Sequence, residues 1–346
     1  MNEIELKFQI PAAQVKAIHA DIGAAQALPL HAAYFDTGEH RLARHRMALR
    51  VRREGDAWVQ TFKGAGADAM TRLEENVPVP PPADGRPRPD LSRHGAEVQA
   101  ALQRVLPQWS PATDPQGLQV GLGALYETCF DRWQADRDSA EGRVQVCLDR
   151  GEIRAGVLRE PLAELELELL SGHPLAVIAQ ARTWVARHDL WLDVQSKAMK
   201  GTRLSAQAAS GHIVAAQVVP APGTVPEQDD PAGWRAWLSA MLDACAGHGA
   251  ELATERPGGA AVLTAWRQCI AQLLDALNSS PLLSEALPPH FAEDTRHLAH
   301  RLNTLVASGD LQGAQALARD PQTTQWSLDV LSALVGTRLN TAHPAA

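Results

Sequence analysis

Glutamates recur at every second position in two segments of this 346-residue chain, ELELELL and MNEIELKF. Side chains two apart on a β-strand lie on the same face, so each segment predicts a strand with one acidic and one apolar face. Stacked carboxylates repel one another, and a divalent cation offsets that repulsion. Hard cations prefer carboxylate oxygens, which favours Mg²⁺ or Mn²⁺ over zinc or copper. The acidic faces consist of Glu3, Glu5, Glu164, Glu166 and Glu168.

Basic side chains alternate in the same way, at Lys7 of the N-terminal segment and in several other segments. A chain of phosphates needs Arg and Lys to bind its oxygens, and metal held by carboxylates to neutralise the charge that develops during transfer. An interior with acidic strands on one side and basic strands on the other provides both, so the pattern predicts phosphate chemistry. For any single pair, a salt bridge on the surface is the competing interpretation. Recurrence on five strands favours the charged interior, because barrels normally enclose apolar side chains. The basic residues of these faces are Lys7, Arg50, Arg52, Lys63 and Arg72. Thr61 shares a face with Lys63, and Glu74 shares one with Arg72.

The elements that must position these residues change in type near residue 205. Before it, short alternating segments bounded by turns predict antiparallel strands. Three segments with apolar residues three and four apart predict helices, and the proline-rich stretch 77–90 predicts a loop. The expected strands cover 34–35, 47–52, 58–63, 73–79, 144–148 and 162–170, and the expected helices cover 12–24, 91–106 and 175–188.

Beyond residue 205 the pattern becomes helical. Alanine- and leucine-rich segments carry large apolar groups at helical spacing, after a stretch rich in proline and glycine that predicts a linker. The expected helices cover 234–246, 262–277, 290–308, 311–318 and 324–339. The sequence therefore predicts an α+β chain, with a β-rich domain at 1–205, a linker at 206–232 and a small all-α helical bundle at 233–346.

Composition excludes several classes of function. The net charge of −8 gives no support to nucleic-acid binding through a basic surface, so local basic clusters must hold any anionic partner. The four cysteines lie far apart without a CxxC pair, which indicates neither a zinc site nor a disulfide framework. With no apolar signal segment and no apolar stretch long enough to span a bilayer, we expect a cytoplasmic protein without membrane contact.

With these residues assembled, roughly the first 205 positions resemble the CYTH domain, the fold of the triphosphate tunnel metalloenzymes. The closest resemblance is to bacterial inorganic triphosphatases that join this domain to a helical CHAD domain. The motifs, in the family's order, are EIELK (3–7), YFDT (34–37), ALRVR (48–52), TFKG (61–64), RLEENV (72–77), CLDRGEIRAG (147–156), ELELEL (164–169) and SK (196–197).

The resemblance implies a closed antiparallel β-barrel with flanking helices, a tunnel that binds linear triphosphate with Mg²⁺ or Mn²⁺. Carried over to this sequence, the five glutamates of the acidic faces would hold metal and position the attacking water. Glu74 and Asp149 would support the basic groups. The implied catalytic residues are Glu3, Glu5, Lys63 and Lys197, and the implied phosphate-binding residues are Lys7, Arg50, Arg52, Lys63, Arg72, Arg132 and Lys197.

Two departures from the family's pattern stand out. The segment CFDRW has Phe130 where the family usually has the first of two alternating basic residues, so one phosphate contact is expected to be missing. The helical part resembles a CHAD domain only weakly, because it is short and its basic residues form no ordered rows. We interpret it as a degenerate scaffold that can contact polyphosphate or protein.

The resemblance favours hydrolysis of inorganic triphosphate to pyrophosphate and phosphate. Alternatives are the hydrolysis of thiamine triphosphate or a nucleoside triphosphate, and the cyclisation of ATP as in class IV adenylate cyclases. The motifs cannot separate these reactions, because they bind phosphate and metal rather than the leaving group. The small supply of tyrosine and phenylalanine favours a bare phosphate chain over a nucleotide base. A non-catalytic polyphosphate-binding module is an alternative of another class, but a pure anion binder gains nothing from inward carboxylates.

Overall fold

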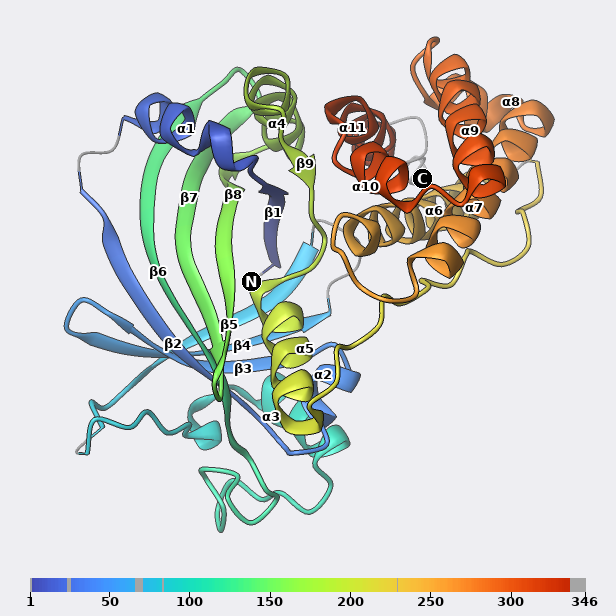
Figure 1. The fold of residues 1–346 in the computed structure, drawn as a ribbon. Helices are drawn as coiled ribbons and strands as arrows, with labels where there is room; N and C mark the ends of the chain where they lie inside the picture. The colour runs from blue at the N-terminus through green and yellow to red at the C-terminus, as the bar shows by residue number, and fades with distance from the viewer. Residues whose placement is uncertain (1, 24–25, 66–70, 83, 229, 337–346) are drawn as a thin grey trace, which may run out of the picture.

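The chain folds as one nine-stranded antiparallel sheet followed by a helical region (Figure 1). The computed structural model describes residues 2–23, 26–65, 71–82, 84–228 and 230–336, with the backbone alone for residues 2, 3, 65 and 71–73. The α+β class predicted from sequence is therefore confirmed. The strands are β1 (Asn2–Gln9), β2 (Leu28–Asp36), β3 (Ala48–Glu54), β4 (Ala57–Ala65), β5 (Thr71–Val79), β6 (Gly123–Asp138), β7 (Gly142–Ala155), β8 (Leu158–Gly172) and β9 (Trp191–Leu192).

Helices lie around the sheet and make up the C-terminal region (Figure 1). Among the described residues, none of them is both long and apolar enough to cross a membrane. They are η1 (Ala12–Gln14), α1 (Val15–Ile22), α2 (Arg41–Arg44), η2 (Leu91–Arg93), α3 (Ala96–Val105), α4 (Leu175–His188), α5 (Lys197–Ser210), α6 (Pro231–Leu252), α7 (Gly259–Ser279), α8 (Pro281–Ala286), α9 (Phe291–Ser308), α10 (Leu311–Ala318) and α11 (Pro321–Val335).

The strand order brings the two ends of the chain's β-rich part together. The sheet runs β5-β4-β3-β2-β6-β7-β8-β1-β9, and β1 also pairs with β5 through three residue pairs centred on Glu3 and Arg72. The acidic strand β8 lies directly beside β1, with Lys7 opposite Glu166 and Glu5 opposite Glu168. The two acidic segments predicted from sequence are thus neighbours in space, although they are about 160 residues apart.

Most predicted elements are present, with informative differences. Helix α4 has the predicted bounds, whereas the segment expected as a helix at 91–106 divides into η2 and α3 around His94 and Gly95. The predicted strand 73–79 and the predicted loop 77–90 overlap at residues 77–79, and the strand prediction is confirmed there, because β5 extends to Val79. Pro78 is tolerated there because β5 pairs with β4 at this position and its β1 pairing covers only residues 71–73. Helix α5 has no counterpart among the predicted elements.

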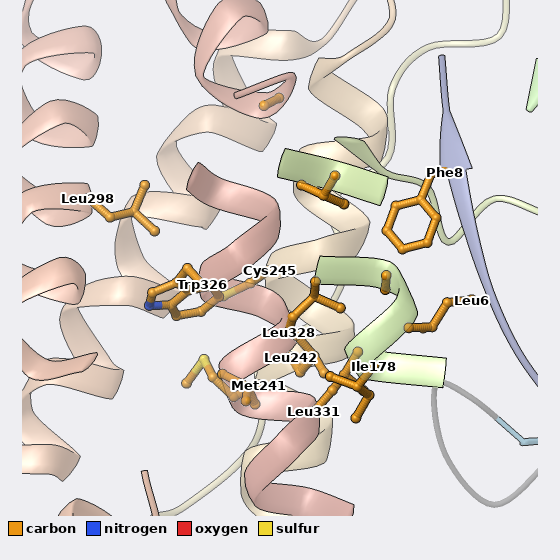
Figure 2. Packing of buried hydrophobic residues seen from close by; sticks show 14 of the residues in the cluster. Leu6, Phe8, Ile178, Met241, Leu242, Cys245, Leu298, Trp326, Leu328 and Leu331 are labelled. Atoms are coloured by element: carbon orange, nitrogen blue, oxygen red, sulfur yellow. The ribbon is translucent and has the colours of Figure 1, made fainter. Parts of the chain in front are cut away.

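The main hydrophobic core lies outside the sheet, between β1, β7, β8 and the helices. Leu6 and Phe8 of β1 pack with Leu165 and Leu167 of β8 beneath α4, and all four side chains are buried. The same cluster continues through α4 into α6 and α11 of the helical region, as Figure 2 shows around Ile178. The apolar faces of the alternating strands are therefore buried outward, which leaves their charged faces on the other side of the sheet.

A buried histidine predicts acid sensitivity of this fold. His94 is 2% exposed, its Nδ1 lies 2.9 Å from Glu75 Oε2, and its Nε2 has no hydrogen-bond partner in the described structure. Burial lowers the pKa of His94, so the unfolded chain takes up the proton first as the pH falls. We expect stability to decrease below about pH 6.5, and to decrease less in the variant His94→Asn, whose amide can still donate to Glu75. Thermal unfolding of both proteins between about pH 7.5 and 5 checks this; parallel curves would contradict it.

Candidate active site

The charged residues predicted from alternation gather on one face of the sheet, here called the inner face, opposite the side covered by α4. Register aligns Arg132, Asp149, Glu164 and Gln9 in one row across β6, β7, β8 and β1. Because side chains alternate along each strand, Glu166 and Lys7 belong to the same face. The leucines between these glutamates point to the opposite side and are fully buried in the main core.

Lys197, the first residue of α5, lies at the centre of the acidic part of the inner face. Its Nζ is 2.7 Å from Asp149 Oδ2 and 2.7 Å from Glu166 Oε1, and it also bonds Glu164. Oxygens of these three carboxylates lie within 4.8 Å of one another, and Asp149 and Glu164 are completely buried. Burial lowers the pKa of Lys197, but the three carboxylates outweigh burial and raise that pKa well above its ordinary value. Lys197 is therefore a permanent cation of the site.

Arg132 of β6 binds two of these carboxylates, those of Asp149 and Glu166. Its Nε is 2.7 Å from Asp149 Oδ1 and its Nη2 is 2.6 Å from Asp149 Oδ2, a bidentate pair, and Nη2 also bonds Glu166. Burial alone would raise the pKa of Glu166, but Lys197 and Arg132 outweigh it and hold that pKa well below its usual range. Glu166 is thus ionised, with one oxygen on each cation.

The start of α5 carries a second lysine on the same side. Ser196 caps the helix by accepting a bond from Met199 N at 3.2 Å, which places Lys200 one turn after Lys197. Lys200 Nζ is 2.7 Å from Asp193 Oδ2 and 3.3 Å from Glu164 Oε2. The helix can approach β6 closely because residue 201 is glycine: a Cβ there would lie 2.1 Å from the Tyr126 ring.

A basic wall faces these carboxylates from β3 and β4. Arg50 Nη1 lies 3.4 Å from the hydroxyl of Tyr34, and Lys63 Nζ lies 2.5 Å from Glu74 Oε2. The Nε atoms of Arg50 and Arg52 are buried and lack a hydrogen-bond partner in the described part of the chain. Burial and the neighbouring charge of Arg50 lower the pKa of Arg52. Arg52 Nη2 pairs with Glu54. The wall can therefore accept an anion at the Nε atoms of its two arginines.

Negative charge is also concentrated where β1 meets β8. Glu5 and Glu168 are direct partners across the two strands. Burial, followed by the charge of Glu5, raises the pKa of Glu168. Carboxylate oxygens crowded in this way fit a hard divalent cation, which would relieve the repulsion. Asp149, Glu164 and Glu166 have the same donor chemistry, but Lys197 and Arg132 already neutralise them.

Phe130 occupies the inner face at the position where a basic residue was expected. Its ring packs with Leu30 and Leu162 in a small apolar cluster and is 7% exposed. Lys197 Nζ lies 5.0 Å from the ring centroid and Arg132 Cζ lies 5.9 Å from it. The aromatic face therefore contacts two cations of the site without supplying a charge itself.

Comparison with known proteins identifies the family. A model of the CYTH domain matches residues 1–201. The chain belongs to the CYTH family. A curated relative is an inorganic triphosphatase of Haemophilus influenzae, 26% identical over 178 residues, which are 50% of this chain and 45% of the relative. The chain thus spans less than half the length of that relative.

Solved structures similar to this CYTH protein include two proteins described as cyclases. One is a putative adenylate cyclase from Bacillus halodurans, with 16% identity, a TM-score of 0.37 and coverage of 54% of this chain and 89% of the other. The second is a putative adenylyl cyclase from Hippeastrum, described as having a dominant triphosphatase activity. It has 18% identity and a TM-score of 0.35, covering 61% of this chain and 97% of the other.

Of the site residues predicted for this CYTH protein, most come together on the inner face. Lys7, Arg132, Asp149, Glu164, Glu166 and Lys197 form one network, and Arg50, Arg52, Lys63 and Glu74 form the basic wall. The backbones of Glu3 and Arg72 pair with each other, but their side chains lie outside the described residues. The family model ends at residue 201, so the CHAD resemblance and the division into domains stay predictions.

Sequence reasoning missed three polar residues that complete this network. Gln9 Nε2 is 2.8 Å from Asp193 Oδ2 and 3.5 Å from Glu164 Oε2, and Lys200 bonds both carboxylates. Gln9 continues the alternation of Glu3, Glu5 and Lys7, so its place was available from the spacing. Asp193 and Lys200 flank the SK motif, and their role depends on how α5 packs against the sheet.

Proposed function

We propose that this protein hydrolyses inorganic triphosphate to pyrophosphate and phosphate on the inner face of its sheet. The observation that carries the proposal is a pair of facing walls: three carboxylates around Lys197 and a basic wall in which the Nε atoms of Arg50 and Arg52 have no hydrogen-bond partner among the described residues. The basic wall matches the charge of a phosphate chain, and the carboxylates match the metal that accompanies it. Membership of the CYTH family and the triphosphatase named among its relatives support this reading.

The proposal includes a closed tunnel. The pairing of β1 with β5 supports closure, because these strands lie near the two ends of the sheet order. In such a barrel the inner face becomes the lining, and a linear substrate contacts strands from all sides. Lys7, Arg50, Arg52, Lys63, Arg72, Arg132 and Lys197 are the proposed phosphate ligands.

Glu5 and Glu168, with Glu3, would hold Mg²⁺ or Mn²⁺. Glu164 and Glu166 would complete the ligand set by giving up a contact with Lys197 or Arg132. The bound cation would neutralise charge that develops on the phosphoryl oxygens. The protein's own groups orient the chain: arginines of β3 bind its oxygens, and Lys197 and Arg132 bring positive charge to the carboxylate side. The glutamates would also position the attacking water, whose proton is released to solvent as the terminal P–O bond breaks and pyrophosphate leaves.

The aromatic residues support a bare phosphate chain over a nucleotide. The two tyrosines of the chain, Tyr34 and Tyr126, stack on each other at 4.7 Å and are buried. Trp58 packs in the cluster of Phe62 and Leu102 outside the inner face, and Trp133 packs edge-on against His19 of α1. The two tyrosine rings therefore stack on each other, and the two tryptophans pack away from the inner face. None of these four rings offers a free face for base stacking.

Phosphate release tests the proposal. We expect triphosphate to be hydrolysed faster than pyrophosphate, long polyphosphate, ATP or thiamine triphosphate when each is supplied with Mg²⁺ or Mn²⁺, and chelation to stop turnover. If ATP or thiamine triphosphate reacts at least as fast as triphosphate, the substrate assignment is wrong. Tight triphosphate binding without turnover would instead support a phosphate-binding module.

A further inference from the structure

The segment between β9 and α5 lies between the inner face and the helical region. On the inner side, Lys7 Nζ donates to the backbone carbonyl of Gln195, and Asp193 N donates to the backbone carbonyl of Lys7 at 2.9 Å. Asp193 also accepts from Gln195 N at 2.8 Å. The position of the Lys7 ammonium therefore depends on the backbone of residues 193–195.

Helix α6 holds the other side of this segment through Glu251. Gln195 is 4% exposed, and its Nε2 donates to Glu251 Oε1 at 2.8 Å while its Oε1 accepts from Arg203 at 2.9 Å. Glu251 is itself fixed, because its Oε2 accepts from Gln217 N at 3.0 Å and bonds Arg256. Each polar atom of the Gln195 side chain is thus engaged, so the amide has one well-defined orientation.

Helix α11 and its neighbour α10 restrain the start of the same segment. Leu192 N donates to Thr324 Oγ1 at 3.0 Å, and the Arg319 guanidinium lies 5.6 Å from the centroid of the Trp191 ring. Behind these contacts, the main core continues from Phe8 and Leu6 through α4 to Leu328 and Leu331 of α11 (Figure 2). The helical region is therefore joined to the segment by specific polar contacts as well as by apolar packing.

We propose that Glu251 is a positioning residue: through Gln195 it fixes the backbone carbonyl that holds the Lys7 ammonium, so that α6 sets the affinity of the inner face for phosphate. This gives the helical region a role in substrate binding without contact with substrate, and for its kinetic readout it rests on the proposed triphosphatase activity. Glu251 acts on a group expected to bind phosphate in the ground state, so its loss should change KM more than kcat.

Variants on both sides of the contact test the proposal. We expect Glu251→Ala and Gln195→Ala each to raise KM for triphosphate about tenfold with little change in kcat, which is the effect of losing one hydrogen bond that acts on binding. Gln195→Ala leaves the Glu251–Arg256 pair in place, so it tests the same contact even if Glu251→Ala fails to fold. Glu251→Gln keeps an acceptor for Gln195 and should restore most of the wild-type KM.

Two matched controls separate positioning from general stability. Glu255→Ala changes an exposed glutamate four residues away, and Asp329→Asn weakens the 2.6 Å contact of Arg182 with Asp329 that joins α4 to α11 elsewhere. We expect Asp329→Asn to lower the unfolding temperature and leave KM unchanged. If Glu251→Ala and Gln195→Ala behave in the same way as Asp329→Asn, the positioning role is overturned.

A readout that needs no turnover keeps the two proposals distinguishable. The Asp193 amide donates to the Lys7 carbonyl at 2.9 Å, and the Gln195 amide donates to Asp193 Oδ1 at 2.8 Å. In Glu251→Ala the loosened segment should exchange these two amide protons with solvent faster than in wild type, as measured by hydrogen–deuterium exchange. This result supports the positioning role even in a protein that fails to hydrolyse triphosphate, and unchanged exchange of both amides overturns it even in an active one.

Discussion

The variant Glu5→Gln is expected to lose at least about 100-fold in turnover with the fold intact. Glu5 faces Glu168 across β1 and β8, where burial and mutual repulsion raise the pKa of Glu168. The amide keeps the shape of the side chain but removes one of the negative charges that would hold a divalent cation. Phosphate release from triphosphate, measured over a range of Mn²⁺ concentrations, checks the loss, and circular dichroism checks the fold.

The metal dependence makes this prediction specific. Because Glu5→Gln weakens cation binding, a higher Mn²⁺ concentration should recover part of the activity. Glu39→Gln is the matched control: it makes the same chemical change at an exposed glutamate paired with Arg41 in the β2–α2 loop and should leave turnover unchanged. Wild-type activity in purified Glu5→Gln would eliminate the metal role of this residue.

The charged faces of the strands could be predicted from sequence because alternation is a local property. Spacing alone places Glu164, Glu166 and Glu168 on one side and the intervening leucines on the other, and the structure has the leucines in the core. The spacing did not show which carboxylates are neutralised. Lys197 pairs with Glu164 and Arg132 pairs with Glu166, whereas Glu168 faces Glu5. This difference arises only from the register of β1, β6 and β8.

The contacts of α5 were beyond sequence reasoning for a physical reason. Lys200 is 36 residues from Glu164, and their contact exists because Gly201 lets the helix lie against the Tyr126 ring. The C-terminal helices were predictable from three- and four-residue spacing, which marks their buried faces. Their docking was not, because the contact of Glu251 with Gln195 joins two polar residues that carry no periodic signal.

The variant Lys197→Met is expected to lower the free energy of unfolding by about 3–5 kcal/mol, the range for a buried charge that loses its partner. The Lys197 ammonium contacts Asp149, Glu164 and Glu166, and the first two are completely buried. Methionine fills similar volume but leaves these carboxylates facing one another with less positive charge. Urea unfolding followed by tryptophan fluorescence measures the loss, and Lys16→Met at an exposed position of α1 should change stability by less than about 0.5 kcal/mol.

A double substitution and the pH dependence of unfolding identify why Lys197→Met loses stability. If uncompensated charge is responsible, Lys197→Met combined with Glu164→Gln should be more stable than the sum of the two single effects predicts. Lys197 and Arg132 hold the pKa of Glu166 below its unfolded value, so their stabilisation is present above about pH 4.3 and disappears as the pH falls further. The stability difference between wild type and Lys197→Met should therefore narrow as the pH falls, because protonation removes the charges that the lysine compensates. Additive single effects and a difference that is constant with pH would instead assign the loss to packing of the Lys197 side chain.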